Sequence, residues 1–93
     1  MTARFELKIP VVTIIEHILY QAHFELDYPT VIDLQRRIKE IKGLEYSPEK
    51  ILAMLSYLMD EGSVKRVMIA DSTGYELTLN AVKKISGRHE LSL

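Results

Sequence analysis

Cysteine is absent from the 93 residues, and its absence excludes several kinds of site at once. Without thiols the chain forms no disulfide, thiolate zinc site or iron–sulfur site, and it offers no cysteine nucleophile. Long apolar runs are missing too, since no stretch approaches the roughly 20 residues that a membrane-spanning helix needs. Charges at Arg4, Glu6 and Lys8 break any signal-peptide core. We therefore expect a cytoplasmic protein that does not enter membranes.

An excess of positive charge is also missing, because 12 Lys and Arg face 13 Asp and Glu and give a net charge of −1. DNA-binding domains usually carry a basic excess, since phosphate neutralisation supplies much of their affinity. The balance counts against DNA, although a local basic patch on a near-neutral protein can suffice. The length fits one domain, and the hydrophobic fraction of 47% is ordinary for a globular protein.

Patterns for catalysis and metal binding are missing as well. The histidines, His17, His23 and His89, are too dispersed for a recognisable metal motif. No glycine-rich phosphate loop, Ser/His/Asp arrangement or pair of catalytic carboxylates stands out. The sequence therefore predicts a protein that is not an enzyme and that uses neither a metal nor a cofactor.

What is present is a succession of short elements with clear start and stop signals. Thr30 and Asp33 form a capping box, Ser47 precedes a proline in a helical first turn, and Gly43 is a natural helix stop. A β-branched run at 64–70, turn formers at 71–74 and a second short run predict a hairpin. The predicted elements are an extended lead-in 1–9, helices 10–24, 30–42 and 47–61, a hairpin 64–78, a helix 79–85 and a tail 86–93.

These elements predict a single α+β domain, mainly α, with a three-helix core, a two-stranded β-hairpin and a short C-terminal helix. The short link between the second and third helices makes them a helix-turn-helix unit. Ile41 is expected on the buried face of the second helix. The centres of the apolar faces are expected to share one core: Ile14, Ile18, Leu34, Ile38, Ile51, Leu55, Leu58 and Leu77.

Two local patterns carry a family resemblance. Residues 58–66 read Leu-Met-Asp-Glu-Gly-Ser-Val-Lys-Arg, in which a glycine and an apolar strand residue precede a basic pair, and residues 75–78 read Tyr-Glu-Leu-Thr. They resemble the recognition-helix exit and the second wing strand of winged helix-turn-helix domains in small prokaryotic, archaeal and viral regulators. MarR-like and PadR-like regulators are the most similar, but PadR-like proteins have a longer C-terminal dimerisation segment.

The resemblance implies a transcription regulator that binds duplex DNA as a homodimer. In the family the third helix enters the major groove, and its outward residues meet base edges. The residues expected to contact bases or phosphates are Arg36, Arg37, Lys39, Ser47, Lys50, Ser56, Tyr57, Lys65 and Arg66. The outward face of the third helix is expected to be Ser47, Glu49, Lys50, Ala53, Ser56, Tyr57 and Asp60, without the arginine or asparagine that read bases most strongly. Leu52 is expected at the edge of the buried stripe of this helix.

Each basic cluster has a second interpretation. The cations of the second helix can form surface ion pairs with Asp33 and Glu40, and the pair at 65–66 can be a charged strand edge that discourages aggregation. The hairpin turn lacks the basic residues usual in the family, which is a departure from it. Net acidity, Glu49 and Asp60 favour a protein-binding adaptor or assembly subunit as the alternative function.

Apolar residues outside the main faces predict how the chain self-associates. A small monomer cannot easily cover them, so we expect them to build a two-fold interface. They are Phe5, Leu7, Ile9, Val12, Tyr20, Leu91 and Leu93.

Overall fold

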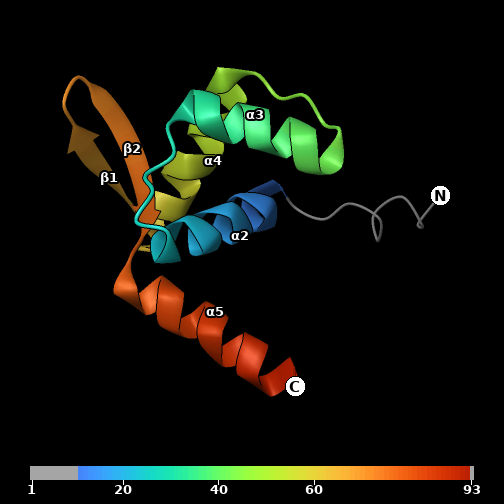
Figure 1. Ribbon diagram of the computed structural model, residues 1–93, viewed down its shortest axis with the longest axis vertical. Coiled ribbons are helices and arrows are strands. Elements are labelled where there is room, and N and C mark those ends of the chain that lie inside the picture. Colours follow the sequence, from blue (N-terminus) through green and yellow to red (C-terminus); the bar gives the residue numbers. More distant parts are fainter. Residues whose placement is uncertain (1–10, 93) are drawn as a thin grey trace.

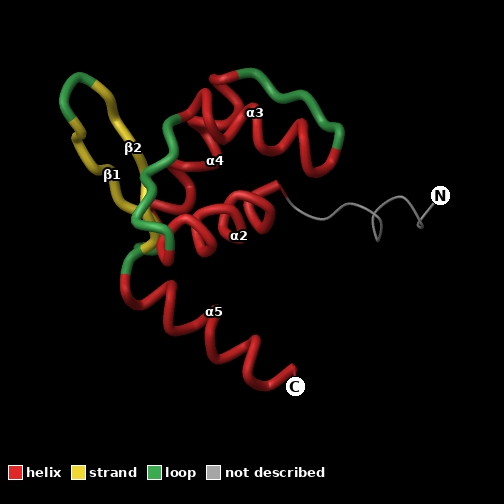
Figure 2. Tube along the Cα trace, viewed as in Figure 1, coloured by secondary structure: helices red, strands yellow, loops and turns green. Residues whose placement is uncertain are grey.

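The computed structural model describes the backbone of residues 11–92 and the side chains of residues 11–87. Its elements are α2 (Val11–Phe24), α3 (Val31–Lys42), α4 (Pro48–Asp60), β1 (Val64–Ile69), β2 (Ser72–Leu77) and α5 (Leu79–Ser92). Figures 1 and 2 show α2, α3 and α4 packed together, with the hairpin and α5 leaving them in different directions. The mainly helical α+β order is the predicted one. The lead-in, Pro10 and the side chains of His89, Leu91 and Leu93 lie outside the described residues.

Helices α3 and α4 begin at the predicted caps. The hydroxyl of Thr30 accepts from the Asp33 backbone N–H at 3.2 Å, and the Asp33 carboxylate accepts from the Thr30 N–H at 3.1 Å. The hydroxyl of Ser47 accepts from the Lys50 N–H at 3.2 Å. These bonds satisfy amide groups that have no partner within the helix. The Thr30 N–H also lowers the pKa of the Asp33 carboxyl, because it stabilises the charged form.

One apolar core joins the three packed helices to the base of the hairpin. Every residue predicted for the core is buried: Ile14, Ile18, Leu34, Ile38, Ile51, Leu55, Leu58 and Leu77. The prediction that Ile41 is buried is wrong, because its side chain is 57% exposed. It lies in the last turn of α3, where it borders an open hollow against α2 beside Thr13 and His17.

The hairpin turn differs from its prediction. Val64 pairs with Leu77 and Ile69 pairs with Ser72, so Ala70 and Asp71 form a two-residue turn. Residues 72–74 therefore belong to β2 and not to the turn. Ala70 has a φ of +53°, the left-handed conformation that such short hairpin loops require.

Gly74 serves packing against the linker that joins α2 to α3. A Cβ atom at this position would lie 2.5 Å from the carbonyl oxygen of Tyr28. Beside it, the Tyr75 N–H donates to the Pro29 carbonyl at 3.0 Å. The glycine thus lets the linker approach β2 closely enough to hydrogen-bond to it.

Helix α5 is longer than predicted, because it continues through Ser86 and Gly87 to Ser92. Thr78 caps its start by accepting from the Ala81 N–H at 3.3 Å. The Ser86 hydroxyl hydrogen-bonds the Tyr20 hydroxyl of α2 at 2.9 Å, and this contact anchors the helix where the stop was expected. A glycine inside a helix costs only about 1 kcal/mol relative to alanine. Among the described helices, none is both long and apolar enough to cross a bilayer.

Candidate nucleic-acid interface

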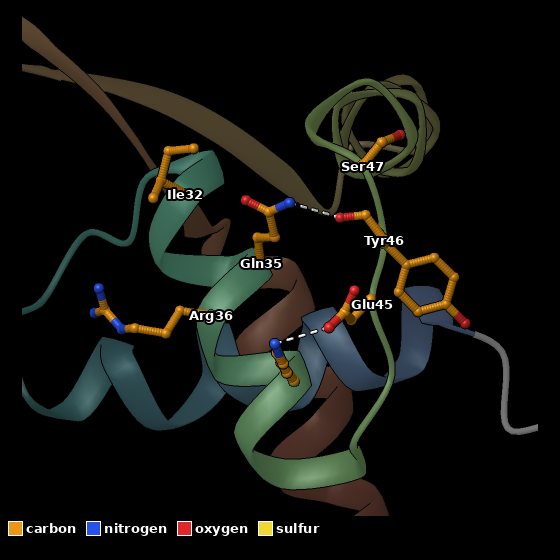
Figure 3. A pocket seen from close by; sticks show the side chains of 7 residues that line it. Ile32, Gln35, Arg36, Glu45, Tyr46 and Ser47 are labelled. Carbon is orange, nitrogen blue, oxygen red and sulfur yellow. Dashed lines mark hydrogen bonds and ion pairs between the residues drawn. The ribbon is translucent and has the colours of Figure 1, made fainter.

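A hollow between α3 and the loop that leads into α4 brings together several predicted site residues. Figure 3 shows Arg36 on α3 and Ser47 at the start of α4 among its lining residues. The amide of Gln35 donates to the Tyr46 carbonyl at 2.8 Å, which ties the loop to α3. Sequence reasoning missed Gln35, because nothing in its neighbourhood separates it from an ordinary solvent-facing helical residue. The full lining is Ile32, Gln35, Arg36, Lys39, Glu45, Tyr46 and Ser47.

Two of the predicted cations on α3 pair with carboxylates of the same region. Arg36 lies 3.2 Å from Asp33 one turn earlier, as the alternative interpretation expected. Lys39 lies 2.7 Å from Glu45 in the α3–α4 loop. Their mutual hydrogen bond raises the pKa of Lys39 and lowers the pKa of Glu45. A DNA phosphate would have to compete with these carboxylates.

Arg37 has a structural partner of a different kind. Its guanidinium lies 2.6 Å from the carboxylate of Asp27, which belongs to the segment between α2 and α3. The side chains of both are less than half exposed, at 30% and 40%. This pair ties the middle of α3 to the segment that follows α2, and Arg37 is not among the residues that line the hollow.

The two cations of the hairpin differ from each other. Lys65 lies 3.4 Å from Glu76, its cross-strand partner in the β1–β2 register. Arg66 is exposed and forms no ion pair with any residue whose side chain the structure describes. Of the predicted pair, Arg66 therefore holds the positive charge that is open to a ligand.

Helix α4 presents the predicted outward face to solvent. All of its expected members are exposed: Ser47, Glu49, Lys50, Ala53, Ser56, Tyr57 and Asp60. Lys50, like Arg66, forms no ion pair within residues 11–87. The carboxylate of Glu61, one turn further along the helix, raises the pKa of the Tyr57 hydroxyl.

The described side chains contain no arrangement that could bind a metal ion. No three His, Asp or Glu side chains among them gather closely enough to hold an ion. The polar groups of the candidate interface are instead hydroxyls, amides and single charges, which suit hydrogen bonding and ion pairing with a macromolecule.

Comparison with solved structures identifies the fold of the chain. No protein-family model matches the chain, and a search of curated proteins finds no similar sequence. Among solved structures, a mutant of Lactococcus lactis ZitR is similar, with a TM-score of 0.59 and 20% sequence identity over 92% of this chain. ZitR is a MarR-family winged-helix transcription regulator.

The chain has the winged helix-turn-helix fold. It spans 56% of the ZitR chain, so it corresponds to about half of that protein. Lys50 lies on α4, the third helix of the core, and Arg66 lies on β1 of the hairpin. Neither forms an ion pair with a residue whose side chain the structure describes.

Proposed function

We propose that this chain is a DNA-binding transcription regulator that binds duplex DNA as a homodimer. The observation that carries the proposal is the outward face of α4, the recognition helix of this fold, all of whose predicted members are exposed. A helix of this width fits the major groove of B-DNA. Lys50 in the first turn of α4 and Arg66 on the wing supply positive charge that no described carboxylate neutralises.

Phosphate contacts provide most of the affinity in this proposal. Lys50 and Arg66 contact phosphates directly, because neither must first leave an intramolecular partner. Arg36 and Lys39 contribute less, since a phosphate has to displace Asp33 or Glu45 from them. Ser47 contributes through its position at the N-terminus of α4, where backbone amides and the helix dipole favour an anion. Ser56 and Tyr57 face the bases or the adjoining backbone.

A homodimer would double the few contacts that one small domain can make. Exposed apolar side chains support such an interface, at Phe24, Leu26 and Leu79, which are 63%, 79% and 71% exposed. Val12 and Tyr20, which the sequence suggested for this role, are partly covered by the chain's own core. The dimer surface proposed from the described residues is therefore the end of α2 with the start of α5.

Acidic groups on the same elements favour a second candidate, a winged helix that binds protein. Glu49 and Asp60 are exposed on α4, and Asp71 is exposed at the wing tip. Carboxylates at these places repel phosphates and suit a basic protein surface. An adaptor or assembly subunit would use this charge directly.

Fluorescence anisotropy with a mixed-sequence duplex at low salt separates the two candidates. We expect the wild-type protein to bind, and Lys50→Ala or Arg66→Ala to weaken binding on any sequence. Lys84→Ala, an exposed lysine of α5 away from the recognition helix, is the matched control and should bind like wild type. Absence of binding by the folded wild type would leave the protein-binding candidate. Sedimentation at about 30 μM, well above a ~1 μM dimer constant, tests the homodimer.

A further inference from the structure

The first three turns of α4 present an unusual set of side chains for a recognition helix. Glu49, Leu52, Ala53 and Ser56 are all exposed, and Leu52 retains 43% of its accessible surface. Their spacing of i, i+3, i+4 and i+7 puts them on one face, which we call the reading patch. The patch combines one carboxylate, two apolar groups and one hydroxyl, and no group of its own donates two parallel hydrogen bonds.

The chemistry of the major groove decides what such a patch can recognise. Guanine presents only acceptors there, so the carboxylate of Glu49 cannot hydrogen-bond to it. Adenine and cytosine present amino donors that a carboxylate can accept from. Thymine carries the C5-methyl group, which is the apolar feature of the groove and the natural partner of an aliphatic side chain. The patch therefore complements A·T pairs best.

Resting on the proposed function, we infer that Leu52 and Ala53 read thymine methyl groups and so give the domain its sequence preference. Glu49 accepts from the amino group of a neighbouring adenine or cytosine and disfavours guanine at that place. A single exposed leucine is ordinary on a protein surface. Here it adjoins Ala53 on the turns of α4 that the fold directs at base edges, and Lys50 lies beside them to hold a phosphate.

Replacing thymine by uracil in the bound duplex tests the inference, because the exchange removes only the methyl group. Random-site selection first supplies a preferred duplex, and each thymine is then exchanged in turn. At the thymines that meet the reading patch we expect about fourfold weaker binding per methyl, the value of one buried CH₂ group. A double-mutant cycle with Leu52→Ala should abolish that uracil effect at one position.

Leu44→Ala is the matched control, since Leu44 is also exposed, at 41%, but lies in the loop before α4. It should keep the full uracil effect. Binding that is indifferent to uracil at every position, or a Leu52→Ala protein that keeps the effect, would overturn the inference and leave DNA binding intact. A folded wild type that binds no duplex would overturn the proposed function and the inference together.

Discussion

Helices α3 and α4 differ in how many of their basic side chains form ion pairs. α3 is the more basic helix, yet three of its four Lys and Arg side chains pair with carboxylates. α4 carries a single lysine, and no described carboxylate pairs with it. Positive charge along a sequence is therefore a poor measure of positive charge available to a ligand.

The polar groups of α3 hold the frame in which α4 is presented. Arg37 reaches back to Asp27 before the helix, and Gln35 and Lys39 reach forward to the loop that leads into α4. These bonds fix where α4 begins. The outward side of α4 forms few such bonds with the other described residues, so its side chains remain accessible to a partner.

The largest effect should distinguish the two sides of α4. Leu55→Ala removes a fully buried side chain and should lower the free energy of unfolding by about 2–5 kcal/mol. Leu52→Ala, on the outward side, should lower it by less than about 1 kcal/mol. Denaturant titration measures both. A Leu55→Ala loss below about 1 kcal/mol would mean that the face of α4 is assigned wrongly.

Two glycines, one in β2 and one in α5, should show the same division between packed and open positions. Gly74→Ala puts a Cβ atom 2.5 Å from the Tyr28 carbonyl oxygen and should cost about 1–3 kcal/mol. Gly87→Ala meets no atom within 4 Å inside α5 and should instead stabilise by about 0.5–1 kcal/mol. Thermal unfolding of the pair checks the close approach, and equal shifts would argue against it.

The start signals of the two helices should differ in strength. Thr30→Ala together with Asp33→Ala breaks both halves of a reciprocal capping box, whereas Ser47→Ala breaks a single hydrogen bond. Ser47→Ala should cost about 1 kcal/mol, and the double variant at the start of α3 should cost more. If Ser47→Ala proved the more destabilising, the start of α3 would not be the better fixed of the two.

The carboxylate of Asp33 should make the stability of the α3 cap depend on pH. Its pKa is lowered in the folded state, so its contribution to stability is present above the ordinary value of 3.8 and is lost as the pH falls through the lowered pKa. Asp33→Asn should therefore flatten the acid limb of the stability curve in that range. An unchanged acid limb would show that the carboxylate does not stabilise the cap.

The smallest effect concerns Lys39 on α3, whose charge is paired with Glu45. Glu45→Gln releases Lys39 from its partner and should strengthen DNA binding slightly. Glu40→Gln removes the same charge from α3 but breaks no described ion pair, so it should have the weaker effect. Anisotropy titrations at one fixed salt concentration compare the two. Equal effects would mean that net charge matters here and the ion pair does not.

Local signals explain which parts of the fold could be predicted from the sequence. The caps at Thr30 and Ser47 depend on residues within one helical turn, and the core positions depend on helical spacing alone. Gly74 was assigned to the turn because its neighbours are turn formers, whereas its role depends on Tyr28 in a distant segment. The stop predicted at Ser86 is wrong, because α5 continues to Ser92, and local signals do not reveal that Ser86 has a partner in Tyr20 of another helix.

The exposure of the α4 face could be predicted from the sequence, but the charge available there could not. The outward face of α4 follows from helical geometry, and the structure exposes all of it. The partners of Arg37 and Lys65 belong to other elements, so only the folded chain reveals them. The contacts with DNA themselves remain predictions.

The salt dependence of DNA binding tests the central claim most directly. Wild-type affinity should fall linearly on a plot of log K against log salt, because each neutralised phosphate releases counterion. Lys50→Ala and Arg66→Ala should each reduce the slope by about 0.9, and Lys84→Ala should leave it unchanged. If Lys50→Ala and Arg66→Ala bound with the wild-type affinity and slope, the open face of α4 would not be the surface that meets DNA.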